Sequence, residues 1–286
     1  MGDNPIKSVG IAGAGTMGQG IAISCALAGY DTLLFDVNTG ACAKAIDSIQ
    51  ISLDQSVAKG KLSPDEATSA KSRIRAVNVI SDLKANLIIE AVVENLKIKQ
   101  QLFADLEEVN SPTTIFATNT SSIPVSTIAL TLKHPSRFVG LHFFNPAHVM
   151  RLVEVISGEQ TDSELVSVMK SFSISLGKAA VEVKDSPGFI VNRVARHFYV
   201  ESLKLLEDGI ADHETIDQLM RSSGFKMGPF ELMDLIGIDV NYSVTESVYE
   251  GFNKALKFKP SKIQDQKIKA GELGRKTGKG FYEYKK

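Results

Sequence analysis

The chain has 286 residues, of which 43% are hydrophobic, so it is long enough to bury a substantial core, most simply in two domains. Its 32 basic and 33 acidic residues give a formal net charge of -1, which argues against nucleic acid as a partner because proteins that bind it carry excess positive charge. No apolar run approaches the ~18 residues of a membrane span, so we predict no membrane partner.

The two cysteines, Cys25 and Cys42, have neither CxxC spacing nor the density of a disulfide scaffold. We therefore predict buried thiols in a reducing compartment. Too few residues precede the first predicted strand for a signal or transit peptide. The predicted location is the cytoplasm, or the mitochondrial matrix if a transit peptide has been removed.

The first half of the chain alternates short apolar runs with helical segments, which is typical of a parallel sheet covered by helices. The predicted strands lie at 9–13, 31–36, 86–92, 114–119, 138–144, 152–156 and 179–183. The most strongly helical segments are 18–29, 38–60 and 96–109. We assign residues 1–185 to one domain of the α/β class.

After Lys184 the pattern changes. Asp185-Ser186-Pro187-Gly188 combines a capping residue with a proline, which predicts a helix start there. Helical segments follow at 189–209, 213–223, 231–252 and 261–271. Residues 186–286 are therefore predicted to form an all-helical C-terminal domain. Its basic, glycine-rich end, GRKTGKGFYEYKK, is expected to be solvated.

The strongest local motif is GIAGAGTMGQG, in which Gly13, Gly15 and Gly18 form GxGxxG between a strand and a helix. The first two glycines allow a tight turn and close backbone approach, and the third lets the helix pack on the strand. Thr16 and Met17 lie between the second and third glycines, next to the start of the helix, whose unpaired N–H groups suit a pyrophosphate. The motif predicts a doubly wound, Rossmann-type, mostly parallel sheet.

Asp36 ends the next predicted strand, roughly twenty residues after the glycines, where a carboxylate can bind the adenosine ribose hydroxyls of a dinucleotide. The same charge repels a 2′-phosphate, and no arginine adjoins it, so NAD is favoured over NADP. The alternative is a glycine-rich turn followed by a solvated aspartate. The combined motif predicts NAD as the cofactor.

Two further strand ends carry polar groups, at the edge where open α/β sheets bind ligands. Glu94 follows the run LIIEAVV, and its spacing fits a ligand contact and a helix-start carboxylate equally well. Asn119, Thr120, Ser121 and Ser122 follow the next strand. Helix capping explains one or two of these four, so we expect them to point into one cleft.

His142 and Glu154 each lie inside an apolar run, FVGLHFF and LVEVI. A lone histidine in such a run more often bonds to the backbone than acts in catalysis, but a buried carboxylate is costly unless it is paired. The candidate partners of Glu154 are Arg151, His148 and His142. If the chain turns back after the first run, Glu154 meets His142, and the pair could accept a hydroxyl proton beside a nicotinamide during alcohol oxidation.

The chain resembles the 3-hydroxyacyl-CoA dehydrogenase family in seven segments: GAGTMGQGIA, EAVVENLKIK, TNTSS, GLHFFNPAHVMRLVEV, PGFIVNR, MGPFEL and GRKTGKGFY. These segments span essentially the whole chain, and the short 3-hydroxybutyryl-CoA dehydrogenases are similar in size. The resemblance implies NAD-dependent oxidation of an (S)-3-hydroxyacyl-CoA to a 3-ketoacyl-CoA, and the reverse, with short acyl chains.

The resemblance also implies roles for single residues. His142 would be the catalytic base, with Glu154 as its partner. Ser121 and Asn192 would hydrogen-bond the substrate's 3-oxygen, and Asn192 would come from the first helix of the second domain. These four residues form the predicted catalytic set.

For the cofactor, the resemblance implies that Asp36 holds the adenosine ribose and Glu94 the nicotinamide ribose. Lys99 and Asn119 would lie near the cofactor as well. A homodimer formed through the C-terminal domain is the implied assembly.

The CoA phosphates require cations, and Lys59 and Lys61 lie at the end of the second predicted helix. A solvated lysine pair is the alternative. The family has a lysine one turn earlier, where this chain has Gln55, and NPAPVMK or NPVPVMK where this chain has His148 and Arg151 in NPAHVMR. These departures bear on CoA recognition and acyl-chain preference.

No set of His, Cys, Asp and Glu residues has the spacing of metal ligands, so we predict no metal. Two other functions stay open from the sequence. One is the same chemistry on a hydroxy acid without CoA, such as gulonate. The other is a dinucleotide-binding protein without catalysis, and the presence of the predicted catalytic set argues against it.

Overall fold

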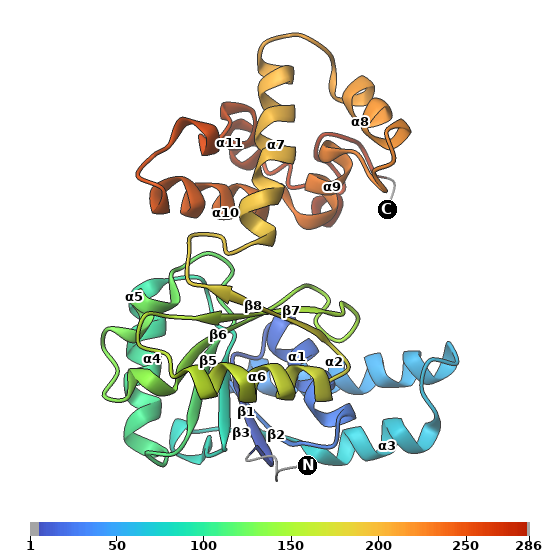
Figure 1. Cartoon of the computed structure of the whole chain (residues 1–286). Coiled ribbons are helices and arrows are strands. Elements are labelled where there is room, and N and C mark those ends of the chain that lie inside the picture. Colours follow the sequence, from blue (N-terminus) through green and yellow to red (C-terminus); the bar gives the residue numbers. More distant parts are fainter. Residues whose placement is uncertain (1–5, 285–286) are drawn as a thin grey trace. The chain divides into compact units, whose positions relative to one another are not determined.

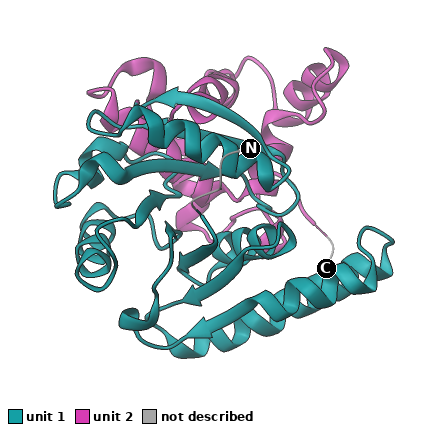
Figure 2. Cartoon of the chain, turned by 60° about the horizontal axis from the view of Figure 1, so that its bottom comes forward, with its two compact units in different colours: residues 1–185 teal, residues 186–286 magenta. Residues whose placement is uncertain are grey.

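The computed structural model describes residues 6–284, and the chain divides into two compact units (Figure 2). The first unit spans residues 1–185 and the second spans residues 186–286. Within the described residues, no helix is both long enough and apolar enough to cross a bilayer.

Within residues 6–284, the first unit contains one sheet of eight strands in the order β3-β2-β1-β4-β5-β6-β7-β8 (Figure 1). The strands are β1 (Ser8–Ala12), β2 (Asp31–Phe35), β3 (Ile74–Val77), β4 (Leu87–Glu90), β5 (Ile115–Thr118), β6 (Phe138–Phe143), β7 (Leu152–Ser157) and β8 (Ala179–Lys184). Neighbours pair in parallel except β6 and β7, which are antiparallel. The strand order reverses between β1 and β4, so the predicted doubly wound, mostly parallel fold is confirmed.

Strand β3 was missed in the sequence prediction. It is a four-residue edge strand that pairs only with β2, and Ile74 is its one buried residue. A four-residue edge strand, interrupted here by Arg75, lacks the continuous apolar run of a central parallel strand. This strand matters for the site, because the loop after β3 lines the cleft described below.

Helices cover both faces of the sheet. They are α1 (Thr16–Leu27), α2 (Thr39–Ala58), α3 (Pro64–Arg73), α4 (Leu96–Val109), α5 (Val125–Ala129) and α6 (Ser163–Ser175). Neither α3 nor α6 was among the predicted helices, although both begin with readable caps. Ser63 and Glu66 form a capping box at α3, and Asp162 accepts a hydrogen bond from the Glu164 N–H at α6.

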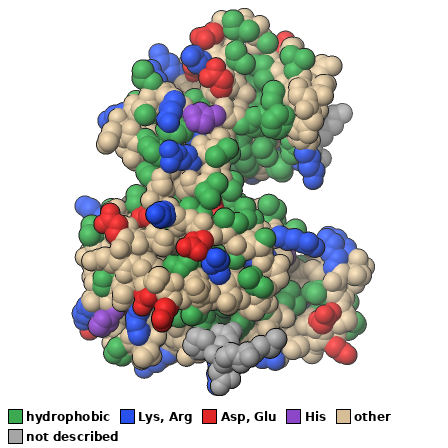
Figure 3. All heavy atoms as spheres, viewed as in Figure 1, with side chains coloured by type: hydrophobic (Ala, Val, Ile, Leu, Met, Phe, Trp, Pro, Cys, Tyr) green, Lys and Arg blue, Asp and Glu red, His purple; other side chains and the backbone are tan. Residues whose placement is uncertain are grey.

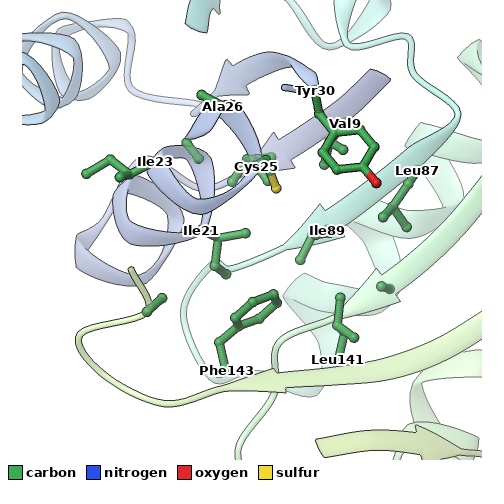
Figure 4. Packing of buried hydrophobic residues seen from close by; sticks show 14 of the residues in the cluster. Val9, Ile21, Ile23, Cys25, Ala26, Tyr30, Leu87, Ile89, Leu141 and Phe143 are labelled. Carbon is green, nitrogen blue, oxygen red and sulfur yellow. The ribbon is translucent and has the colours of Figure 1, made fainter. Parts of the chain in front are cut away.

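The main core lies between one face of the sheet and helices α1, α2, α3 and α6. Figure 4 shows the part of it in which residues of α1 pack against the central strands. Alternate residues of the central strands point into it, among them Val9, Ile89 and Leu141. Tyr30 closes one end, with its hydroxyl 2.7 Å from the Ser175 hydroxyl. The fully parallel strands near the middle are buried on both faces, which explains their uninterrupted apolar sequences.

The second unit is helical, as predicted. Its helices are α7 (Val191–Glu207), α8 (His213–Ser222), α9 (Pro229–Ile236), α10 (Ile238–Gly251) and α11 (Lys262–Lys269). Prediction of one helix over 231–252 was wrong, because the chain breaks at Gly237 between α9 and α10. Gly237 has φ +102°, a conformation that glycine adopts readily and that a continuous right-handed helix excludes.

The helix predicted over 189–209 is present, but Asp185 does not cap it as predicted. The carboxylate of Asp185 accepts hydrogen bonds from the N–H groups of Val125 (3.0 Å) and Ser126 (2.7 Å), so it caps α5 in the first unit. Helix α7 begins only at Val191, without a side-chain cap. A capping residue can serve a helix distant in sequence, and spacing alone does not reveal that choice.

Up to residue 284, the glycine-rich end of the chain packs on the second unit's core, so the expectation of a solvated tail is wrong there, and residues 285–286 lie outside the described residues. Asp234 is buried and accepts hydrogen bonds from the Phe281 and Tyr282 N–H groups and from the Tyr284 hydroxyl, at 2.9, 2.9 and 3.0 Å. A Cβ on Gly280 would lie 2.1 Å from an Asp234 carboxylate oxygen. The glycine is needed because the buried carboxylate packs against the tail backbone.

We predict that Asp234→Ala destabilises the second unit by roughly 3 kcal/mol, because it leaves buried N–H groups without an acceptor. Tyr284→Phe removes one of the same hydrogen bonds and should cost about 1 kcal/mol. Thermal unfolding and limited proteolysis of the tail measure both effects. Equal stability of the two variants would contradict the assigned role of Asp234.

Candidate active site

The glycine turn between β1 and α1 has the geometry of a dinucleotide cradle. The Gly13 N–H donates to the Phe35 carbonyl (2.7 Å), and a Cβ at Gly13 would lie 2.5 Å from the Ala91 carbonyl oxygen. A Cβ at Gly18 would lie 1.8 Å from the Gly13 carbonyl oxygen. At Gly15, by contrast, no atom lies within 4 Å of the Cβ position, so open space is left at the start of α1. A phosphate can therefore approach the helix N-terminus.

Asp36 is fixed beside this turn. One carboxylate oxygen accepts a hydrogen bond from the Ala14 N–H, and the other accepts one from the Asn38 N–H, both at 2.9 Å. The side chain therefore joins the end of β2 to the glycine turn, and the solvated-aspartate alternative does not describe it. This placement at the cleft matches the position expected for a ribose-binding carboxylate.

A cleft of about 1160 Å³ opens at this edge of the sheet. Predicted cofactor residues line it: Gly13, Gly15, Thr16, Met17 and Asp36. Apolar residues missed by the sequence prediction line it as well, with Val37 88%, Val79 51% and Ile98 47% exposed. Open apolar side chains next to Asp36 suit a flat ring such as adenine.

These apolar residues were missed because each lies in a different loop or helix, and only the shared sheet edge brings them together. Val79 follows the unpredicted β3, and Ile98 belongs to α4. Val37 could have been found, because it directly follows the Asp36 of the motif.

Behind the cleft lies a buried group of charges. Lys99 is 1% exposed, and its Nζ lies 2.6 Å from Glu90 Oε1 and 3.1 Å from Glu94 Oε2. Glu90 also accepts hydrogen bonds from the Thr118 hydroxyl (2.6 Å) and the Val92 N–H (2.8 Å). Burial raises the pKa of Glu90, while the Lys99 charge opposes that rise. Because its ammonium is enclosed by the two carboxylates, Lys99 positions Glu94 within this site.

Glu94 accepts hydrogen bonds from the hydroxyl-rich segment after β5. Its Oε1 accepts hydrogen bonds from the Thr120 hydroxyl (2.6 Å), the Ser121 N–H (3.0 Å) and the Ser122 hydroxyl (3.2 Å). Burial acts to raise the pKa of Glu94, but the Lys99 charge and these hydrogen bonds lower it below its ordinary value. Glu94 is therefore an ionised, oriented carboxylate that directly follows Val93, a residue of the cleft. Asn95, and not Glu94, provides the side-chain cap of α4.

The expectation that all four polar residues after β5 point into one cleft is wrong for Thr120 and Ser122, which are buried with their hydroxyls bonded to Glu94, and also for Asn119. The Asn119 side-chain oxygen accepts a hydrogen bond from the Phe143 N–H (2.9 Å), so it ties the end of β5 to the end of β6. A side chain that bridges two strand ends is not distinguishable in sequence from one that binds a ligand. A direct contact of Asn119 with the cofactor stays a prediction.

His142 and Glu154 face each other across the antiparallel pair β6 and β7. They are direct partners in the strand register, and His142 Nδ1 lies 2.8 Å from Glu154 Oε2. His142 is 5% exposed and Glu154 1% exposed. The centroids of the Phe144 ring and the His142 imidazole ring lie 4.5 Å apart. Of the three candidate partners for Glu154, the structure brings His142 to it, and the two form a buried hydrogen-bonded pair.

The remaining predicted residues lie further from this pair in sequence. Lys59 and Lys61 are exposed at the end of α2, where the sequence placed them. Their contact with the phosphates of CoA stays a prediction. Asn192 is the second residue of α7 in the second unit, and its carbonyl accepts a hydrogen bond from Arg196 Nε (3.2 Å). Its contact with a substrate stays a prediction. Within residues 6–284, no group of three or more His, Cys, Asp or Glu is placed to hold a metal ion.

Comparison with known families gives two matches along the chain. Residues 8–186 match the model described as "3-hydroxyacyl-CoA dehydrogenase, NAD binding domain". Residues 188–284 match the model described as "3-hydroxyacyl-CoA dehydrogenase, C-terminal domain".

Individual relatives agree with these matches. The 3-hydroxyadipyl-CoA dehydrogenase of Escherichia coli (strain K12) is 45% identical over 98% of this chain, which spans 59% of that protein. The probable 3-hydroxybutyryl-CoA dehydrogenase of Bacillus subtilis (strain 168) is 38% identical, with 98% of both chains covered. The structure of (S)-3-hydroxybutyryl-CoA dehydrogenase from Ralstonia eutropha has a TM-score of 0.93 and 38% identity, covering 98% of this chain and 100% of that one.

The buried ion pair provides a test of the site's electrostatics. Lys99→Met leaves Glu90 buried beside Glu94 without a counter-charge, and we expect it to destabilise the first unit by about 3 to 5 kcal/mol. Glu90→Gln combined with Lys99→Met removes both charges and should recover most of that loss. Denaturant unfolding measures both variants. A single variant as stable as the double one would show that the pair does not compensate a buried charge.

Proposed function

The chain belongs to the 3-hydroxyacyl-CoA dehydrogenase family, and from that premise we propose that it interconverts (S)-3-hydroxyacyl-CoA and 3-ketoacyl-CoA with NAD. The proposed substrates are short, such as 3-hydroxybutyryl-CoA and acetoacetyl-CoA. The observation that supports the chemistry most directly is the buried 2.8 Å contact between His142 and Glu154, because alcohol oxidation needs a base for the hydroxyl proton.

The match of residues 8–186 to an NAD-binding domain confirms the predicted cofactor. The residues fit NAD, since Gly15 leaves space at the N-terminus of α1 and Asp36 lies at the cleft for the adenosine ribose. Preference for NAD over NADP follows from the charge of Asp36 and from the uncharged Val37 next to it. Glu94, held by Lys99, is proposed to hold the nicotinamide ribose.

The proposed reaction moves one hydride and one proton. When bound, NAD would supply the acceptor for the hydride that leaves C3 of the hydroxyacyl group. His142 accepts the hydroxyl proton on Nε2 at the same time, while its Nδ1–H donates to Glu154. In the reverse direction, the protonated imidazole returns its proton to the 3-oxygen as C3 receives the hydride. Ser121 and Asn192 are proposed to hydrogen-bond that oxygen.

Glu154 contributes through orientation and charge. Its contact with Nδ1 selects the tautomer that leaves Nε2 as the proton acceptor, and its negative charge stabilises the imidazolium. Both side chains are nearly inaccessible to water, so this interaction acts in a medium of low effective dielectric. The same burial explains why two polar residues occupy positions in apolar strands.

The proposed assembly is a homodimer formed through the second unit. Figure 3 shows hydrophobic side chains exposed on the visible face of this unit. In this unit Val194, Ile210 and Leu219 are each at least 60% exposed. Exposed apolar side chains of this kind suit an interface between copies.

Cys25 and Cys42 are free and buried, which supports the proposed location in a reducing compartment, the cytoplasm.

Steady-state assays with acetoacetyl-CoA and longer 3-ketoacyl-CoAs, each with NADH and with NADPH, test the proposed function. We expect turnover with NADH, a decline with chain length, and kcat/KM at least about 100-fold lower with NADPH because Asp36 repels its 2′-phosphate. Absence of turnover with every 3-ketoacyl-CoA would refute the proposal. Faster reaction with free hydroxy acids would favour a CoA-free substrate.

The acid–base assignment predicts that His142→Gln lowers kcat by about 100-fold or more, because general acid–base catalysis contributes at least that much. Glu154→Gln should also lower kcat, since the amide cannot stabilise the imidazolium by charge. Dissociation constants for NADH, measured by fluorescence, should stay near the wild-type value in both variants. Wild-type kcat in His142→Gln would exclude His142 as the base.

A further inference from the structure

The turn between β6 and β7 rests on a buried lysine. Lys178 is 8% exposed, and its Nζ donates to the carbonyl oxygens of Ala147 (2.6 Å) and Met150 (2.9 Å). Ala147 also packs on α1, because a Cβ at Gly20 would lie 3.0 Å from the Ala147 side chain. His148 follows Ala147 directly and is exposed. The imidazole is therefore carried by a well-anchored turn.

The charge of Lys178 is not neutralised by a nearby carboxylate. Both of its hydrogen bonds go to neutral carbonyl groups, and among residues 6–284 it forms no ion pair. Burial lowers the pKa of Lys178. Burying a cation without a counter-ion is costly. Because no carboxylate neutralises Lys178, its charge gives a positive potential at the turn that carries His148.

A second cation, Lys61, lies just after the end of α2. Gly60, with φ +66°, ends the helix, and the Lys61 N–H donates to the Ser56 carbonyl (2.9 Å). This helix-terminating turn fixes the exposed Lys61. Burial, then the charges of Lys178 and of Lys61, lower the pKa of His148 below its ordinary value of 6.5. These two lysines are the charged groups that act on His148, and the three form one basic cluster.

We propose that His148, with Lys61 and Lys178, forms a proton-linked binding site for a phosphate group of the CoA moiety. The exposed His148 and Lys61 can donate to the several acceptor oxygens of a phosphate, while the buried Lys178, whose Nζ is bonded to two carbonyls, contributes its charge. His148 lies beyond the end of β6, whereas His142 lies inside that strand, so the two histidines have separate roles. The inference rests on the proposed function, which supplies a phosphate-bearing substrate.

The site makes CoA binding depend on pH. In the free protein the two lysine charges disfavour the protonated imidazole. A bound phosphate offsets those charges and raises the pKa of His148, so binding takes up a proton. Affinity is then highest at low pH. It falls as pH rises through a window that starts below 6.5, where the free imidazole titrates, and ends at the higher pKa of the complex.

Calorimetric binding of CoA, pantetheine and inorganic phosphate at pH 6.0 and pH 8.5 tests the proposal without relying on turnover. We expect wild-type protein to bind CoA about fivefold more tightly at pH 6.0 than His148→Gln does, as one added ionic contact provides. Comparing the two proteins at each pH cancels the titration of the phosphate itself. Pantetheine, which lacks phosphates, should bind both proteins alike at both pH values.

Further variants sharpen the comparison. His148→Lys, which keeps a positive charge at both pH values, should bind CoA tightly at pH 8.5 as well. Lys61→Met should weaken CoA binding, whereas Lys44→Met, an exposed lysine in the body of α2, should leave it unchanged.

Three results would overturn the proposal: equal CoA affinity of wild type and His148→Gln at pH 6.0, equal effects of the two lysine variants, or inorganic phosphate binding as tightly as CoA. Loss of the proposed function has a different signature. In that case CoA binding would persist while no 3-ketoacyl-CoA is reduced.

Discussion

The antiparallel pairing of β6 with β7 is the constraint on which the proposed chemistry depends. It places His142 directly opposite Glu154 within an otherwise mostly parallel sheet. Because side chains alternate between the faces of a strand, a slip of one residue would turn Glu154 to the opposite face. Neither side chain could then be satisfied by the other in its buried position. The register that stabilises the sheet is thus the same register that creates the acid–base pair.

The cleft edge follows the same rule, in which buried charge is tolerated where it is paired and oriented. Glu90 and Lys99 neutralise each other, and Lys99 also holds Glu94, whose second oxygen receives hydrogen bonds from the segment after β5. This arrangement presents one ionised carboxylate at the carboxyl end of the parallel strands. The second unit repeats the principle for stability, since Asp234 is buried with three donors from the chain end.

Much of the fold and site could be predicted because the signals are local. The glycine motif, Asp36 and the apolar strand runs each lie within a short window, and the family resemblance assigned roles to them. The failures involve contacts between distant segments. Asp185 caps a helix about sixty residues earlier in the chain, Asn119 bridges to β6, and the apolar cleft residues converge from separate loops. Gly237 breaks a helix that periodicity alone extends, because its positive φ is invisible in the pattern.

The central claim is that His142 and Glu154 act as one unit, and a double-mutant cycle on kcat tests it most directly. Four proteins are compared by steady-state reduction of acetoacetyl-CoA: wild type, His142→Gln, Glu154→Gln and the double variant. If Glu154 acts through the imidazole, the double variant should have nearly the same kcat as His142→Gln alone. Losses that multiply in the double variant would show that the two residues contribute independently, and would contradict the account.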